Sequence, residues 1–156
     1  MTFTINDVFI DSSILIECNK GNKVKLFVTL MANDIYRCYI SETVVSEFLF
    51  HFLAHNGNKS PQSIHSSRKI AEVFSESKQF KLINTCSFLP TDKQIFTMVP
   101  MFMAKYNLLP NDAIILATCK LHGITQLASH DSDFIIPCQG EGIELLREEE
   151  LANHNA

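Results

Sequence analysis

The sequence contains no tryptophan, only five glycines and five prolines among 156 residues, and no excess of basic side chains. So few glycines and prolines, beside a hydrophobic content of 46%, exclude an intrinsically disordered or low-complexity chain. Thirteen lysines and arginines against seventeen aspartates and glutamates exclude a protein that holds nucleic acid through bulk positive charge. Nucleic acid remains open as an enzyme's substrate, because such an enzyme needs a basic rim only near its cleft.

Cysteine pairs of the Cys-x-x-Cys type and long apolar runs are missing as well. The five cysteines are odd in number and widely spaced, so we expect reduced thiols rather than a disulfide framework. The sequence has no run of about 20 apolar residues and no signal-peptide pattern at its start. We therefore expect a cytoplasmic protein without membrane segments, folded as a single domain over residues 1–156.

Short apolar runs that suit buried strands alternate with stretches of helical periodicity. We expect strands at residues 8–10, 36–40, 80–85, 124–128 and 143–146. We expect helices after an N-cap at 12–13 and at about 22–33, 42–55, 64–78, 91–107, 112–123 and 147–151, with a polar loop at 57–63 and a turn or short helix at 131–134. The alternation predicts an α/β domain whose mostly parallel sheet is covered on both faces.

Acidic residues occupy the positions where such a sheet places its functional groups. Asp11 directly follows the first strand and Asp131 follows the strand at 124–128, so both should lie at the carboxyl edge of the sheet. Asp112 begins a predicted helix, whose dipole favours a negative charge there. Glu47 lies among apolar residues of the helix at 42–55 and needs a partner. Crowded carboxylates repel one another unless a cation holds them, and hard oxygen ligands select Mg²⁺ or Mn²⁺.

A site of this kind, with one or two ions, is best suited to hydrolysis of phosphodiester bonds. We expect Asp11, Asp112 and Asp131 to bind the metal, directly or through water, with Asp133 as a candidate extra ligand. Glu47 would help to orient the attacking water. The predicted catalytic set is therefore Asp11, Glu47, Asp112 and Asp131.

Four segments that carry these residues resemble the motifs of the PIN-domain ribonucleases, in particular the VapC toxins of bacterial and archaeal toxin–antitoxin pairs. The segments are residues 9–16, 41–49, 111–119 and 127–134. In the second, the family's acidic residue matches Glu47 rather than Glu42. The third is similar to the family's Asp that opens an Ala-rich helix, here Asp112. The fourth resembles a strand that ends in Thr-x-Asp-x-Asp-Phe, with Ser129 in place of the threonine.

This resemblance implies a PIN-like three-layer α/β/α fold with a mostly parallel five-stranded sheet. It also implies an endoribonuclease that depends on Mg²⁺ or Mn²⁺ and acts as the toxin of a toxin–antitoxin pair. The family implies an RNA substrate, frequent homodimers, and inhibition by a small antitoxin whose tail enters the cleft.

Other interpretations remain open at this point. The chain could be a catalytically inactive PIN-like binding module, or a PIN nuclease with a housekeeping role. Two rival classes lack their patterns: a phosphatase of the haloacid-dehalogenase type would need a second Asp where Ser13 stands, and a receiver-like domain would need paired acidic residues before its first helix and a Lys late in the chain. His51 and His55 have the spacing of zinc ligands on a helix but lack a third ligand. A lone Asp such as Asp112 is ordinarily a helix cap, and only the order of all four acidic positions favours a site.

Overall fold

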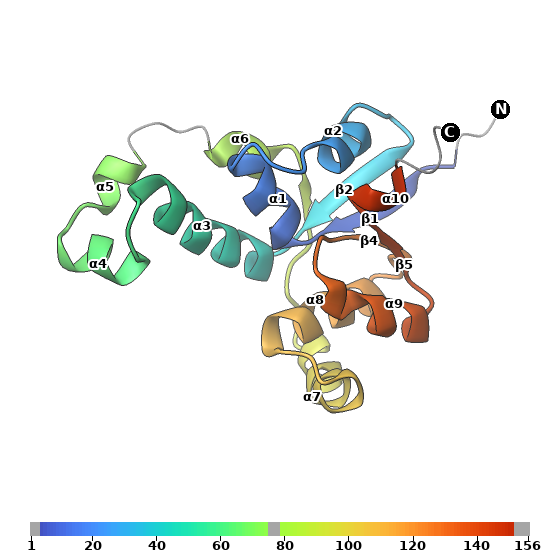
Figure 1. The fold of residues 1–156 in the computed structure, drawn as a ribbon. Coiled ribbons are helices and arrows are strands. Elements are labelled where there is room, and N and C mark those ends of the chain that lie inside the picture. The colour runs from blue at the N-terminus through green and yellow to red at the C-terminus, as the bar shows by residue number, and fades with distance from the viewer. Residues whose placement is uncertain (1–3, 75–78, 152–156) are drawn as a thin grey trace.

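A five-stranded parallel sheet forms the centre of the fold (Figure 1). The structure is a computed structural model that describes residues 4–74 and 79–151. The strands are β1 (Asn6–Ile10), β2 (Tyr36–Ile40), β3 (Ser87–Phe88), β4 (Gln126–Ala128) and β5 (Glu144–Leu146), in the order β3-β2-β1-β4-β5. The predicted α/β class with a five-stranded parallel sheet is confirmed.

Strand β1 is the central strand of the sheet. Val8, Phe9 and Ile10 are fully buried, as expected for a parallel strand covered on both faces. On one side β1 pairs with β2, and on the other it pairs with β4, where Phe9 lies beside Leu127. The strand order reverses between β1 and β4, and in open α/β sheets the binding crevice lies at the carboxyl ends of the strands at such a point.

Helices cover both faces of this sheet. The helices of the described residues are α1 (Ser12–Asn19), α2 (Lys25–Met31), α3 (Glu42–Gly57), α4 (Pro61–Ser66), α5 (Ile70–Val73), α6 (Gln79–Asn84), α7 (Ile95–Tyr106), α8 (Pro110–Leu121), the 3-10 turn η1 (Ser132–Phe134), α9 (Ile135–Glu141) and α10 (Glu148–Leu151). In Figure 1, α1 and α2 lie on one side of the sheet and α7, α8 and α9 on the other. Helices α3, α4 and α5 project away from the sheet, and we call them the arm. No helix among the described residues is long and apolar enough to cross a membrane.

The strand predicted at residues 80–85 is wrong. Residues 79–84 form α6, and the edge strand β3 follows at Ser87–Phe88. Leu82 and Ile83 of α6 and Cys86 after it pack against the core. A short apolar stretch of this kind fits a strand as well as a buried helix. Both residues of β3 are exposed, so no apolar pattern indicates it.

The arm also differs from the prediction. Helix α3 continues to Gly57, where the left-handed Asn58 caps it, so the loop expected at 57–63 is limited to three residues. Ser60 caps α4 by accepting a hydrogen bond from the backbone N–H of Ser63 at 3.2 Å. The single helix expected at 64–78 is two short helices, separated by a turn in which Arg68 has a φ of 57°. Its last four residues, 75–78, lie outside the described residues.

Candidate metal centre

Asp11 stands at the junction of β1 and α1. It is the N-cap of α1, because its side chain accepts a hydrogen bond from the backbone N–H of Ser13 at 3.3 Å. The N-cap predicted at Ser12 and Ser13 is therefore wrong. The residue is only 3% exposed, so the carboxylate is held at the carboxyl end of the central strand and nearly out of solvent.

Two serine hydroxyls fix the Asp11 carboxylate. Oδ2 accepts from Ser13 Oγ at 2.5 Å and from Ser129 Oγ at 2.7 Å. These hydroxyls in turn accept from the backbone N–H groups of His130 and Asp131, both at 3.0 Å. Burial raises the pKa of Asp11, and the hydrogen bonds from the two serines oppose that rise. The network thereby joins the start of α1 to the segment that follows β4.

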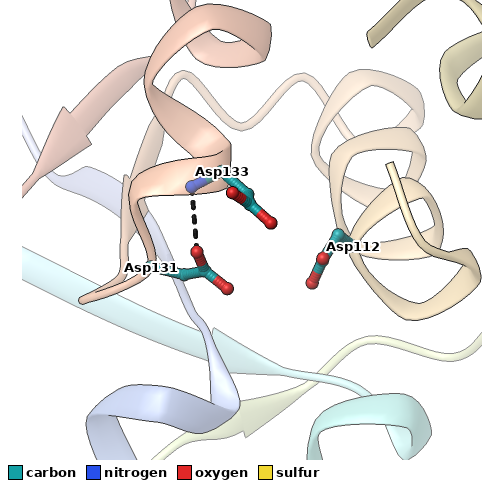
Figure 2. Close-up of side chains that lie close together, drawn as sticks. All are labelled: Asp112, Asp131 and Asp133. Carbon is teal, nitrogen blue, oxygen red and sulfur yellow. Dashed lines mark hydrogen bonds between the residues drawn. The ribbon is translucent and has the colours of Figure 1, made fainter. Parts of the chain in front are cut away.

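Three carboxylates lie close together beside this network, and we call them the acidic cluster: Asp112, Asp131 and Asp133. Figure 2 shows them facing one another, Asp112 from α8 and the other two from the segment after β4. One oxygen from each lies within 4.8 Å of the other two. Asp131 caps η1, because its Oδ1 accepts from the backbone N–H of Asp133 at 2.8 Å.

The charge in this region perturbs Asp112 strongly. Its pKa is raised from 3.8 to about 7, first by burial and then by the negative charges of Asp11, Asp131, Glu47 and Asp133. The other three predicted catalytic residues and Asp133 therefore lie within electrostatic reach of Asp112. A cation bound here would relieve this repulsion.

The donor set fits a hard divalent cation. The acidic cluster offers carboxylate oxygens alone, which are the ligands that Mg²⁺ and Mn²⁺ prefer, whereas zinc sites use histidine and cysteine. Within residues 4–74 and 79–151, no other group of three His, Cys, Asp or Glu side chains converges in this way. The cluster is thus the candidate metal centre of the described chain.

The structure brings together three of the four residues that the sequence predicted as metal ligands. Asp11, the fourth, lies outside the acidic cluster and is bound by serines instead. Glu47 projects from α3, and its Oε2 accepts a hydrogen bond from Asn111 Nδ2 at 3.4 Å, next to Asp112 in the chain. Glu42, the rejected alternative, accepts from Thr91 Oγ1 at 2.6 Å. The roles of these residues in binding and catalysis stay predictions.

Sequence reasoning did not identify the groups that hold the carboxylates in place. Ser13 and Ser129 bind Asp11, and Asn111 binds Glu47. Serine next to an aspartate normally indicates only a cap or a turn. The contact between Ser129 and Asp11 spans 118 positions of the chain, so only the fold could show it.

The sequence and the fold are similar to those of known proteins. The model of the PIN domain matches residues 8–137 of the chain. Ribonuclease VapC2 of Methanocaldococcus jannaschii is 33% identical over 131 residues, which cover 83% of this chain and 87% of that protein. Ribonuclease VapC6 of the same organism is 33% identical over 140 residues, covering 83% and 91%. A solved chain from a toxin–antitoxin complex of Klebsiella pneumoniae superposes with a TM-score of 0.60 at 21% identity, covering 90% of this chain and 97% of that one. The chain belongs to the PIN domain family.

Proposed function

We propose that this protein is a metal-dependent endoribonuclease that hydrolyses RNA phosphodiester bonds at the acidic cluster, as the toxin of a toxin–antitoxin pair. The observation that carries the proposal is the convergence of Asp112, from α8, with Asp131 and Asp133, from the segment after β4. Two ribonucleases named VapC at 33% identity support the reaction class. Mg²⁺ or Mn²⁺ is the proposed cofactor, since all three ligand groups are carboxylates.

We assign a separate role to each carboxylate according to its position in the site. Asp112, Asp131 and Asp133 offer oxygens to the cation, and Asp11 adds negative charge from a carboxylate that its serine partners keep fixed. A divalent cation bound there supplies positive charge for the scissile phosphate and lowers the pKa of water. Glu47 is the group proposed to orient the attacking water and accept its proton.

Cleavage of RNA tests the proposal directly. The purified protein is incubated with a pool of single-stranded and structured RNAs in Mg²⁺, in Mn²⁺ and in EDTA. We expect cutting with either cation, none in EDTA, and a loss of at least about a hundredfold in Asp112→Asn. Asp34→Asn is the matched control, because Asp34 is exposed and precedes β2 at the amino end of the sheet. Equal cutting by both variants would remove the acidic cluster from the mechanism.

The alternatives predict different results in the same assay. A folded wild-type protein that binds RNA but never cuts it would be a PIN-like binding module. A protein that cuts RNA in the test tube but does not slow growth when expressed without its partner would be a housekeeping nuclease. Toxin activity requires both cutting and growth arrest, and both must be lost in Asp112→Asn.

A small antitoxin is the proposed protein partner, and the arm is the proposed contact surface. A groove of about 480 Å³ lies between α3 and α4, with Phe50, Leu53, Pro61 and Ile70 in its lining. Phe50 is 48% exposed, an unusual environment for phenylalanine. Co-purification with the protein encoded beside this gene tests the partner. Phe50→Asp should abolish it, whereas Val28→Asp, at an exposed position on α2, should not.

We also propose an oligomeric state, a location and a domain organisation for this protein. Phe96 and Met101 expose about half of their area on α7, which supports a homodimer, and sedimentation at several concentrations tests it. All five cysteines are free thiols, which supports a cytoplasmic location. The buried hydrophobic residues of the main core form one cluster, which supports a single domain over residues 1–156, and limited proteolysis tests that.

A further inference from the structure

A cavity adjoins the acidic cluster on the side of α7 and α9. It has a volume of about 460 Å³, within the range of pockets that hold small ligands. Asp133 belongs both to the acidic cluster and to the wall of this cavity. A ligand in the cavity can therefore contact a residue that also contributes an oxygen to the acidic cluster. We call it the α7–η1 cavity.

The wall of the α7–η1 cavity has no surplus of charge. Its two charged side chains are Lys105 and Asp133, and Lys105 Nζ is already paired with Glu141 Oε1 at 2.8 Å. A phosphate in this cavity would face Lys105, whose charge Glu141 already compensates, and the negative charge of Asp133. The cavity is better suited to a neutral ligand, with any phosphate directed toward the acidic cluster and its cation.

The remaining lining combines apolar surface with polar groups that are free to bind. Ile136 is 71% exposed and forms part of the wall. Asn107 and Ser132 also line it, and within the described residues neither side chain has a hydrogen-bond partner. An amide offers both a donor and an acceptor, the combination that reads the edge of a nucleobase. A base in single-stranded RNA presents a flat apolar face and a polar edge, and both find matching groups in this wall.

One side of this cavity is held in place by a hydrogen bond and a close packing contact. The hydroxyl of Tyr106 donates to Glu141 Oε1 at 2.6 Å, and Gly140 packs so closely on the tyrosine that a Cβ there would collide with it. Asn107 follows directly as the left-handed C-cap of α7, with a φ of 55°. The direction in which the Asn107 side chain leaves the backbone is thus set by a fixed helix end.

We propose that the α7–η1 cavity binds one nucleobase of the RNA strand next to the scissile phosphate, and that Asn107 is a specificity-determining residue. This assignment rests on the proposed ribonuclease function. It adds to the cleavage of a phosphodiester bond the recognition of the base next to that bond. The base stands against Ile136, its edge meets the Asn107 amide, and its phosphate reaches the acidic cluster past Asp133.

Two pairs of variants test the assignment. Asn107→Gly removes the amide and keeps the left-handed backbone accessible, and its control is Asn58→Gly, a left-handed asparagine that caps α3. Ala104→Trp fills the cavity from α7, and its control is Ala71→Trp, at an exposed position on α5 outside this cavity. Thermal unfolding of all four variants establishes that each is folded.

Binding is measured with the four ribonucleoside 5′-monophosphates in Mg²⁺, by NMR shifts of the cavity residues, because these ligands contain no phosphodiester bond. We expect wild type to bind one base about tenfold more tightly than the weakest. Asn107→Gly should abolish that difference, Ala104→Trp should weaken all four nucleotides, and both controls should behave as wild type. Shifts confined to the acidic cluster, or the same base preference in Asn107→Gly as in wild type, would overturn the assignment.

Sequencing the ends produced from a random RNA pool separates this proposal from the proposed function. Cutting with an identical base preference in wild type and Asn107→Gly would overturn the base site and keep the nuclease. Base-selective nucleotide binding in the cavity without any RNA cutting would overturn the nuclease and keep the base site. A change of oligomeric state in Ala104→Trp with nucleotide binding unaltered would make the cavity a protein interface and overturn the base site.

Discussion

At the scale of single residues, Asp11 shows how the fold holds a charge that burial disfavours. Its Oδ2 accepts from two serine hydroxyls, at 2.5 and 2.7 Å, while the residue is 3% exposed. Hydrogen bonds to a carboxylate stabilise its charged form and oppose the cost of desolvation. The two serines are therefore part of the site although neither is expected to touch the cation.

Ser129→Ala should destabilise the protein. It removes a buried hydrogen bond to a carboxylate and the acceptor for the backbone N–H of Asp131, and we expect a loss of about 1.5–3 kcal/mol in the free energy of unfolding. Urea unfolding measures it. Ser12→Ala is the control, because Ser12 Oγ lies 3.5 Å from Asp11 and the bond is weak. Equal losses of unfolding free energy in the two variants would show that the short hydrogen bond of Ser129 stabilises the protein no more than the long one of Ser12.

Asp112 gives the metal-free protein a pH dependence. Its pKa is about 7 in the folded protein, against 3.8 ordinarily, so between these values the folded state binds more protons than the unfolded state. This contribution to stability is complete below pH 4 and is lost as the pH rises through 7. In EDTA, wild type should lose more stability between pH 5 and pH 7.5 than Asp112→Asn. A decline equally steep in both would assign it to other groups.

The carboxylates of the site could largely be predicted from the sequence, but the side chains that hydrogen-bond to them could not. Asp112, Asp131 and Asp133 follow a strand or open a helix, and the rule for parallel sheets places such groups at one edge. The fourth motif includes Ser129, but nothing in the sequence indicates that its hydroxyl binds Asp11. Asp11 was correctly placed at the sheet edge, but its separation from the acidic cluster depends on side-chain contacts that no spacing encodes.

At the scale of elements, prediction succeeded where burial produces a pattern. Strand β1 is a continuous apolar run because both of its faces are covered. Strand β3 is two exposed residues at the sheet edge, and α6 was mistaken for it. Helix α9 (Ile135–Glu141) was not predicted at all, because Pro137, Gly140 and Gly142 suggest a loop. Its first turn tolerates proline, and Gly142 ends it in the left-handed conformation.

The packing of α9 on α7 depends on a glycine. A Cβ at Gly140 would collide with the Tyr106 hydroxyl, whose bond to Glu141 keeps the ring from moving away. Gly140→Ala should therefore cost about 1–3 kcal/mol of unfolding free energy, measured in urea. In a Tyr106→Phe background the hydroxyl is absent, and the same substitution should cost less. A double-mutant cycle with no coupling would place the strain elsewhere.

At the scale of the whole molecule, cation binding should appear as stability. A cation that binds the folded protein alone, at ten times its dissociation constant, stabilises it by about 1.4 kcal/mol. Mg²⁺ or Mn²⁺ should therefore raise the Tm of wild type and of Asp34→Asn, and should leave that of Asp112→Asn nearly unchanged. An equal rise in all three would place the cation outside the acidic cluster.

Because β1 lies at the centre of the sheet, the site beside it is assembled only after a distant part of the chain has been synthesised. β1 emerges first from the ribosome, yet its second neighbour, β4, and the residues Ser129, Asp131 and Asp133 follow more than a hundred positions later. A nascent chain that carries Asp11, Glu47 and even Asp112 has no assembled cluster until the segment after β4 has been made. We therefore expect a nuclease that cuts at the acidic cluster to stay inactive toward the messenger that encodes it until the segment after β4 has been made.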